Sequence, residues 1–97
     1  MLKFSDYDGT YDVMTDSEKA KIDAVVTGAS WEEYERVDAD IPVFYNPVSL
    51  KKKDKASIIS HKADIINKAG ATDFYENDPQ EADMLRILCP DCTIHKV

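Results

Sequence analysis

Three aspartates stand within seven positions near the start of this chain, directly after its first hydrophobic residues, and the first two are at alternate positions. The stretch reads Ser5-Asp6-Tyr7-Asp8-Gly9-Thr10-Tyr11-Asp12. Like charges repel at this spacing, and aspartate is a poor strand former, so the crowding needs a compensating interaction. Alternate residues of an extended segment point to the same side, so Asp6 and Asp8 can face one site. A hard divalent cation such as Mg²⁺, which prefers oxygen ligands, is the interaction we expect there.

Two other structures compete for this acidic stretch. In a calcium-binding EF-hand loop that begins at Asp6, the glycine position falls on Tyr11 and the bidentate glutamate position falls on Ser17, so that loop is excluded. A solvated acidic turn, in which Gly9 supplies an unusual backbone angle, stays open. The positions of the other polar residues must decide between a turn and a metal site.

Length and composition indicate one globular domain over residues 1–97. The chain has 97 residues, of which 43% are hydrophobic and 32% are charged. One hydrophobic core fits this length and two do not. No apolar run approaches the roughly 18 residues of a membrane span, and the N-terminus lacks the basic and then apolar pattern of a secretory leader. We therefore expect a cytoplasmic protein with no membrane partner.

The balance of charge limits the partners of the chain. The formal net charge of −7 disfavours non-specific attraction to nucleic acid or to an anionic membrane. The stretch from Lys51 to Lys55 is a local basic patch through which nucleic acid could still bind. A solvated loop is the competing interpretation of this patch, because charge runs often have no other role.

Two cysteines lie close together in Cys89-Pro90-Asp91-Cys92. With His95 they make half of a zinc site, and the other half would need His61 or a ligand from outside the chain. A redox role would place the first cysteine at the start of a helix, whereas this pair follows a predicted helix end. We expect Cys89 to pack in the core, and the metal and redox interpretations stay open.

Three capping sequences and one long amphipathic stretch predict four helices. The capping sequences are Thr15-Asp16-Ser17-Glu18, Ser30-Trp31-Glu32-Glu33 and Asp78-Pro79-Gln80-Glu81. The longest helix is predicted from Lys55 to Ala69, with Gly70 as its stop.

Five short apolar runs between these helices are typical of strands. They are residues 2–5, 24–27, 41–45, 72–75 and 93–97. Continuous apolar runs separated by helices predict strands buried on both faces of a parallel sheet. The chain therefore predicts an α/β fold, a small three-layer sandwich around a five-stranded sheet. In such sheets ligands bind beyond the carboxyl ends of the strands, where the strand order reverses.

Polar residues follow the predicted strands at that edge. Asp6 and Asp8 follow the first strand, Thr27-Gly28 end the second, and Glu76-Asn77-Asp78 close the fourth. Asp78 can approach Asp6 and Asp8 if the fourth strand lies beside the first. Three converging carboxylates would be costly unless a cation such as Mg²⁺ lay among them.

The order of these motifs resembles that of the haloacid dehalogenase (HAD) superfamily. Asp6-Tyr7-Asp8-Gly9-Thr10 is similar to its first motif, and Val25-Val26-Thr27-Gly28 looks like its second. Lys62 is the best match for the third motif, and residues 74–79 look like the fourth, an acidic cluster that closes a strand. The resemblance spans residues 2–97.

This resemblance implies a Rossmannoid sheet of order 5-4-1-2-3 with Asp6 and Asp8 at the reversal point. The short stretch before Thr15 and the basic loop before the long helix leave no room for an inserted cap domain. The chain therefore resembles the capless members, whose open sites accept large or polymeric phosphorylated substrates or are closed by a partner subunit. A homo-oligomer is compatible with this interpretation.

The resemblance also implies an activity and a role for each matching residue. Asp6 would be the nucleophile that forms an aspartyl phosphate, and Asp8 would be the general acid and base. Thr27, Gly28 and Lys62 would bind the phosphoryl group. The Mg²⁺ ligands would be Asp6, Asp8 and Asp78. The substrate would be a phosphomonoester, either a phosphorylated small molecule or a polymer end such as a nucleotide or nucleic-acid end.

The chain departs from the family pattern at two positions, and these departures keep other functions open. Ala29 follows Gly28 where an arginine is often found, and Asn77 stands where a second acidic residue is common, unless Glu76 or Glu81 assists. Lys62 could instead be a surface residue of its helix, and in that case Lys55 is the candidate for the lysine of the site. A catalytically inactive HAD-like binding module and a metal-stabilised structural subunit are the alternative functions.

Overall fold

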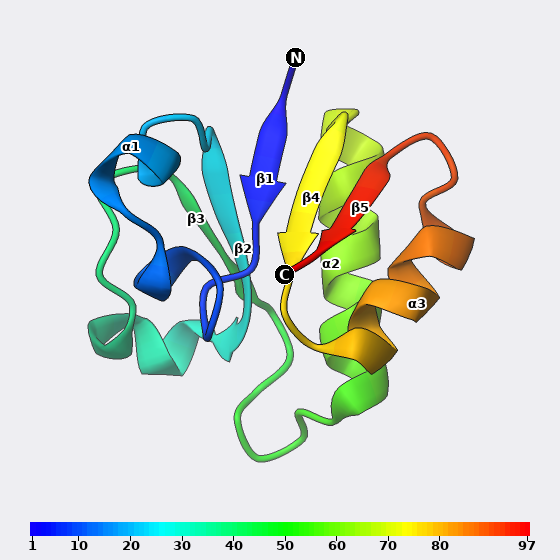
Figure 1. Ribbon diagram of the computed structural model, residues 1–97. Helices are drawn as coiled ribbons and strands as arrows, with labels where there is room; N and C mark the ends of the chain where they lie inside the picture. The colour runs from blue at the N-terminus through cyan, green and yellow to red at the C-terminus, as the bar shows by residue number, and fades with distance from the viewer.

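A computed structural model describes all residues from 1 to 97, and it has five strands in one sheet with helices between them (Figure 1). In chain order the elements, with η for a 3₁₀ helix, are β1 (Lys3–Ser5), η1 (Tyr11–Val13), α1 (Asp16–Lys19), β2 (Ala24–Ser30), η2 (Trp31–Arg36), β3 (Val43–Asn46), α2 (Lys55–Ala69), β4 (Asp73–Glu76), α3 (Pro79–Leu88) and β5 (Thr93–Lys96).

The sheet is parallel throughout, and its order is β3-β2-β1-β4-β5. Read from the other edge this is 5-4-1-2-3, so the predicted strand order is confirmed. β1 is the central strand: Phe4 lies beside Ala24 of β2 on one side and beside Phe74 of β4 on the other. The carboxyl ends of all five strands therefore meet at one edge, with the reversal of strand order at β1 (Figure 1).

The main core lies between the sheet and the two long helices. Phe4, Val26 and Phe74 project from neighbouring strands toward Ile66 of α2 and Leu85 of α3, and all five are buried. Cys89 belongs to the same core, so its predicted packing role is confirmed, and both cysteines are free thiols. Burial raises the pKa of both thiols, that of Cys92 to about 11.

The second face of the sheet has a thinner cover than the predicted three layers suggest. A smaller cluster of Tyr7, Tyr11, Ile22 and Val25 packs there beneath η1 and α1. Figure 1 shows α1 on one side of the molecule, with α2 and α3 together on the other. The second layer is therefore short helices and irregular chain, whereas the first is two regular helices.

The capping signals mark the helix starts correctly, but two of the four predicted helices are short or of another type. Thr15 and Ser30 both form the predicted capping boxes. The helix after Thr15 has four residues, and that after Ser30 is a 3₁₀ helix with a kink at Glu33. Trp31 and Tyr34 are exposed, so this segment buries no apolar stripe that would stabilise a longer α-helix.

The long helix is confirmed over its predicted length. α2 begins after Asp54, whose side chain accepts a hydrogen bond from the Ser57 amide, and ends at Gly70 in the left-handed region with φ of 69°. No helix of the structure has the length and the apolar character needed to cross a membrane.

Replacing Leu85 by alanine should destabilise the fold, because this side chain is fully buried in the main core. We expect the Leu85→Ala change to lower the free energy of unfolding by about 2–5 kcal/mol. The matched control is Ile87→Ala on the same helix, where the side chain is 70% exposed and the loss should stay within about 0.5 kcal/mol. Urea unfolding followed by circular dichroism measures both, and equal losses would contradict the assigned core.

Candidate functional site

A polar pocket lies at the carboxyl edge of the sheet, beside the end of β1. Its volume is about 230 Å³. Five of the six residues predicted for the site line it, namely Asp6, Asp8, Gly28, Lys62 and Asp78. The strand order thus brings together residues that are up to 72 positions apart in the chain.

Asp6 is held rigidly at the end of the central strand. Its backbone amide donates to the Tyr75 carbonyl at 2.9 Å, which continues the pairing of β1 with β4. Its carboxylate accepts from Lys62 Nζ at 2.9 Å through Oδ1 and from the Thr10 hydroxyl at 3.3 Å through Oδ2. The side chain is therefore buried and fixed by contacts on both oxygens.

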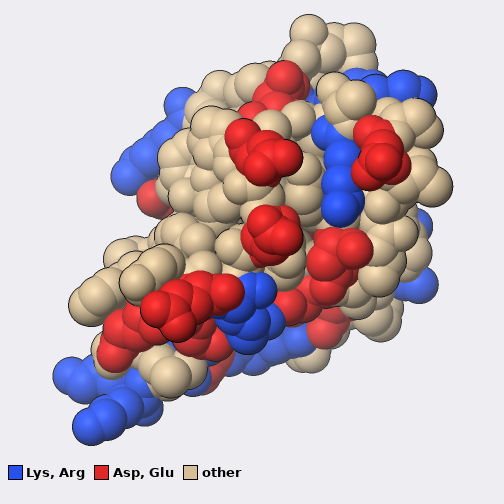
Figure 2. Space-filling model, turned by 90° about the vertical axis from the view of Figure 1, so that its left-hand side faces the viewer, with Lys and Arg blue, Asp and Glu red and all other residues tan.

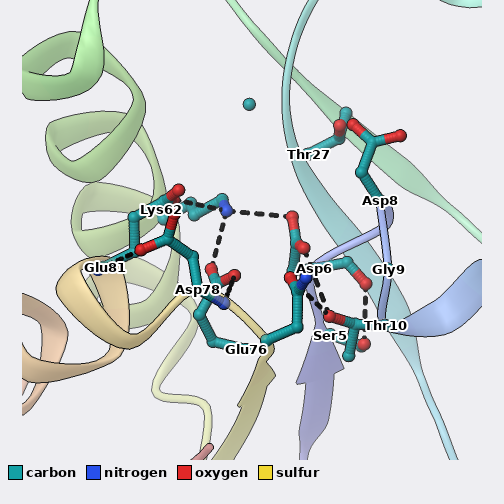
Figure 3. Close-up of polar contacts among 12 residues, drawn as sticks. Ser5, Asp6, Asp8, Gly9, Thr10, Thr27, Lys62, Glu76, Asp78 and Glu81 are labelled. Atoms are coloured by element: carbon teal, nitrogen blue, oxygen red, sulfur yellow. Dashed lines mark hydrogen bonds and ion pairs between the residues drawn. The ribbon is translucent and has the colours of Figure 1, made fainter. Parts of the chain in front are cut away.

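Lys62 is the centre of the site, and its alternative interpretation as a surface residue is wrong. The residue is 2% exposed, on the inner face of α2. Its ammonium donates to Asp6 at 2.9 Å, to Glu76 at 2.7 Å and to Glu81 at 2.7 Å (Figure 3). Burial lowers the Lys62 pKa, but the attraction of these three carboxylates outweighs burial and raises it. All three ammonium protons are used within the protein.

Carboxylates outnumber cations in this cluster. Asp6, Glu76, Asp78 and Glu81 surround Lys62 and Lys55, so two negative charges are in excess when all groups are ionised. Burial raises the pKa of Glu76 to about 7 and also raises that of Asp6, although Lys62 opposes both shifts. The cluster therefore favours the uptake of positive charge, either a proton or a cation.

Asp78 lies in the same pocket as Asp6, but its carboxylate already has two partners. Oδ1 accepts from the Glu81 amide at 3.0 Å and so caps α3, and Oδ2 accepts from Lys55 Nζ. These contacts lower the pKa of Asp78, the Lys55 hydrogen bond most of all. No group of three or more acidic, histidine or cysteine side chains is arranged in this structure as a set of metal ligands.

Asp8 faces the other wall of the pocket. In Figure 3 its carboxylate points away from Lys62. It pairs with both terminal nitrogens of Arg36, at 2.6 and 3.2 Å. Arg36 comes from η2 and also lines the pocket, and the sequence interpretation missed it. No motif marks this residue, because its approach to Asp8 depends on the path of the chain after β2.

The second predicted motif, Val25-Val26-Thr27-Gly28, lies inside its strand and not at the end of it. β2 continues to Ser30, so Thr27 lies within the strand and not at its end. Its side chain is fully buried, its hydroxyl accepts from the Ala29 amide at 3.1 Å, and it is not among the residues that line the pocket. Gly28 does line the pocket, and a Cβ at this position would lie 2.8 Å from Ile58, so glycine lets β2 approach α2.

Thr10 and Asn77 join the first and fourth motifs. The Thr10 hydroxyl bridges Asp6 Oδ2 and Asn77 Oδ1, at 3.3 and 3.1 Å. Gly9 has a positive φ of 75°, and a Cβ there would lie 2.4 Å from the Asn77 amide nitrogen. Asn77, where the family pattern has an acidic residue, thus holds the loop that follows Asp6.

The basic patch from Lys51 to Lys55 is divided by the fold. Lys51 and Lys52 are exposed, whereas Lys53 pairs with Glu33 at 2.6 Å and Lys55 pairs with Asp78 and Glu81. Acidic side chains predominate on the face of the molecule shown in Figure 2. Lys53 therefore lines the pocket, and Lys55 pairs with two carboxylates beside it.

Comparison with protein-family models, curated proteins and solved structures finds no match to this chain. The function therefore has to be argued from the pocket itself.

Removal of the Lys62 ammonium should destabilise the chain strongly, because three buried carboxylates would lose their shared partner. We expect Lys62→Met to lower the free energy of unfolding at neutral pH by about 3–5 kcal/mol. The control is Lys68→Met on the same helix, where the side chain is 76% exposed and pairs only with Asp64, so that the loss should stay below about 1 kcal/mol. Similar losses in urea unfolding would exclude a central role for Lys62.

The raised pKa of Glu76 should make stability depend on pH. Between its ordinary value of 4.5 and about 7, the folded chain holds a proton that the unfolded chain has released. The free energy of unfolding should therefore fall as pH rises through this range, and the fall should be smaller in Glu76→Gln. Urea unfolding of the unaltered chain and of Glu76→Gln at pH 5 and at pH 7.5 measures how much the free energy of unfolding of each protein changes with pH. Parallel slopes in the two proteins would show that Glu76 does not titrate in this range.

Proposed function

We propose that this chain is a minimal HAD-like, Mg²⁺-dependent phosphohydrolase that cleaves a phosphomonoester through an aspartyl phosphate on Asp6. The observation that carries the proposal is the position of Asp6 at the end of the central strand, fixed by Lys62, in one pocket with Asp8, Gly28 and Asp78. This is the point of strand reversal, where parallel sheets bind their ligands.

The connections between strands support a capless site. Only η1 and α1 lie between β1 and β2, and only residues 47–54 lie between β3 and α2. Neither connection holds a domain that could close over the pocket. An open pocket suits a large substrate, so a nucleotide or a nucleic-acid end is within the proposed substrate class.

The first step transfers the phosphoryl group to the protein. A carboxylate oxygen of Asp6 attacks phosphorus, and the bond from phosphorus to the ester oxygen breaks. Asp8, in its protonated form, gives its proton to that oxygen, and the alcohol leaves. Lys62 and Thr10 hold the Asp6 carboxylate in place, so little reorganisation precedes the attack.

The second step returns the chain to its first state. Asp8, now a carboxylate, takes a proton from water as the water oxygen attacks phosphorus. The bond from phosphorus to Asp6 breaks, and orthophosphate and the free carboxylate are formed. The backbone of Gly28, which is part of β2 and lines the pocket, is the proposed contact to a phosphoryl oxygen, and the neighbouring Thr27 hydroxyl accepts from the Ala29 amide.

The oxygen donors of the pocket are of the type that a hard divalent cation prefers. Its candidate ligands are all oxygen atoms, and the four carboxylates around Lys62 and Lys55 exceed these two ammonium groups by two charges. Asp6, Asp78 and the backbone carbonyl of Asp8 are the proposed ligands. When bound, Mg²⁺ supplies positive charge that offsets the repulsion between a carboxylate and a phosphate dianion.

Hydrolysis of 4-nitrophenyl phosphate with Mg²⁺ tests this function. We expect turnover that chelation with EDTA abolishes, loss of turnover to background in Asp6→Asn, and a fall of about 10²–10⁴-fold in Asp8→Asn. Asp78→Asn keeps a good helix cap but removes a charge, so it should raise the Mg²⁺ concentration required. The control is Asp83→Asn, which is 75% exposed on α3 outside the pocket and should keep full activity.

Two results would contradict the proposal. Activity that survives Asp6→Asn would assign the hydrolysis to another group or to a contaminant. If no variant hydrolyses the ester but orthophosphate still binds in titration calorimetry, the chain is a catalytically inactive binding module.

A further inference from the structure

A pair of fixed cations lies on the pocket wall away from Lys62. Arg36 of η2 and Lys53 of the basic loop both line the pocket. Glu33 joins them, since it accepts from Lys53 Nζ at 2.6 Å and lies 3.4 Å from Arg36 Nε. The side chains of Glu33 and Lys53 are only 18% and 17% exposed. One carboxylate therefore holds two cations from distant parts of the chain side by side.

The Arg36 guanidinium forms an ion pair with the Asp8 carboxylate in this structure. Its two terminal nitrogens contact both oxygens of the Asp8 carboxylate. In the proposed reaction Asp8 must present an oxygen to the ester group of the substrate. Asp8 can do so freely only when this ion pair opens, so the Arg36–Asp8 contact opposes the reaction until another anion takes its place on Arg36.

A phosphate-type anion is the group that best replaces Asp8 there. The planar guanidinium presents two parallel donors that match the oxygens of a phosphate as well as those of a carboxylate. Lys53 adds a second cation, already ordered by Glu33. On the opposite wall Lys62 donates all three ammonium protons to carboxylates, which leaves Arg36 and Lys53 as the other cations that line the pocket.

We propose that the substrate carries a second phosphate group, which displaces Asp8 from Arg36 and so frees Asp8 to act on the ester. Arg36 is then the residue that determines specificity, Lys53 supports it, and Glu33 positions both. This inference rests on the proposed phosphohydrolase function. It defines the substrate class as a phosphomonoester with a further phosphate or phosphodiester near the scissile group.

Kinetics with matched substrates test the inference. The substrates are 4-nitrophenyl phosphate, a sugar bisphosphate and an oligonucleotide with a terminal phosphate. We expect kcat/KM for at least one substrate with a second anion to exceed that for the aryl phosphate by about tenfold or more. Arg36→Gln should remove this preference. Comparison of kcat/KM for the bisphosphate with that for the oligonucleotide shows which kind of second anion Arg36 binds.

A binding experiment separates this inference from the catalytic proposal. Calorimetry with inorganic pyrophosphate and orthophosphate should show about tenfold tighter binding of pyrophosphate to the unaltered chain. Arg36→Gln should remove the difference, and Asp8→Asn should increase pyrophosphate affinity because a competitor for Arg36 is lost. The control is Arg86→Gln on α3, outside the pocket, which should change neither affinity.

The outcomes are distinct. Hydrolysis without any preference for a second anion, or a preference that survives Arg36→Gln, overturns this inference and leaves the phosphohydrolase proposal. A pyrophosphate preference that depends on Arg36, in a chain that hydrolyses none of the esters, overturns the proposed function and the release of Asp8 with it. A preference in both rate and binding that is lost in Arg36→Gln supports the inference.

Discussion

The buried ammonium of Lys62 is the interaction on which the rest of the site depends. An isolated charge in the protein interior is costly, so Lys62 can be buried only because Asp6, Glu76 and Glu81 surround it. These partners come from the end of β1, from β4 and from α3, while Lys62 itself is on α2. One cation therefore ties the central strand to its neighbour and to both long helices, and any loosening of this contact would move the candidate nucleophile.

The same cluster gives the pocket two electrostatically different walls. Around Lys62 the carboxylates are in excess, so this wall attracts a cation or a proton. Across the pocket, Glu33 and Asp8 balance the charges of Arg36 and Lys53, so this wall has cationic hydrogen-bond donors without the excess of carboxylates. A phosphorylated ligand with a divalent cation has this complementary charge pattern. Asp8 lies between the walls and pairs with Arg36.

The uneven layers of the fold explain why the pocket stays open. α2 and α3 build a continuous core on one face, and this face supplies Lys62 and Glu81 from rigid helices. The other face has short helices and irregular chain, so the loop after Asp6 depends on a few contacts with the residues that follow β4. Thr10, which bridges Asp6 and Asn77, and Gly9, which approaches Asn77 closely, supply those contacts. Side chains from the two rigid helices and the loop that follows Asp6 thus meet at the end of β1.

Local sequence patterns were enough to predict the features that depend on contacts within a few residues. Capping boxes, the Gly70 stop and apolar runs predict the starts of the helices, the span of α2 and the approximate strands, since each reflects contacts within a few residues. The strand order and the meeting of Asp6, Asp8, Gly28, Lys62 and Asp78 could also be anticipated, because the motifs resemble a family with a known order of strands. The burial of Lys62, the burial of Thr27 within β2 and the pairing of Arg36 with Asp8 could be known only from the folded structure. Such contacts join residues far apart in the chain, and their formation depends on packing and on where each strand ends, which no local pattern records.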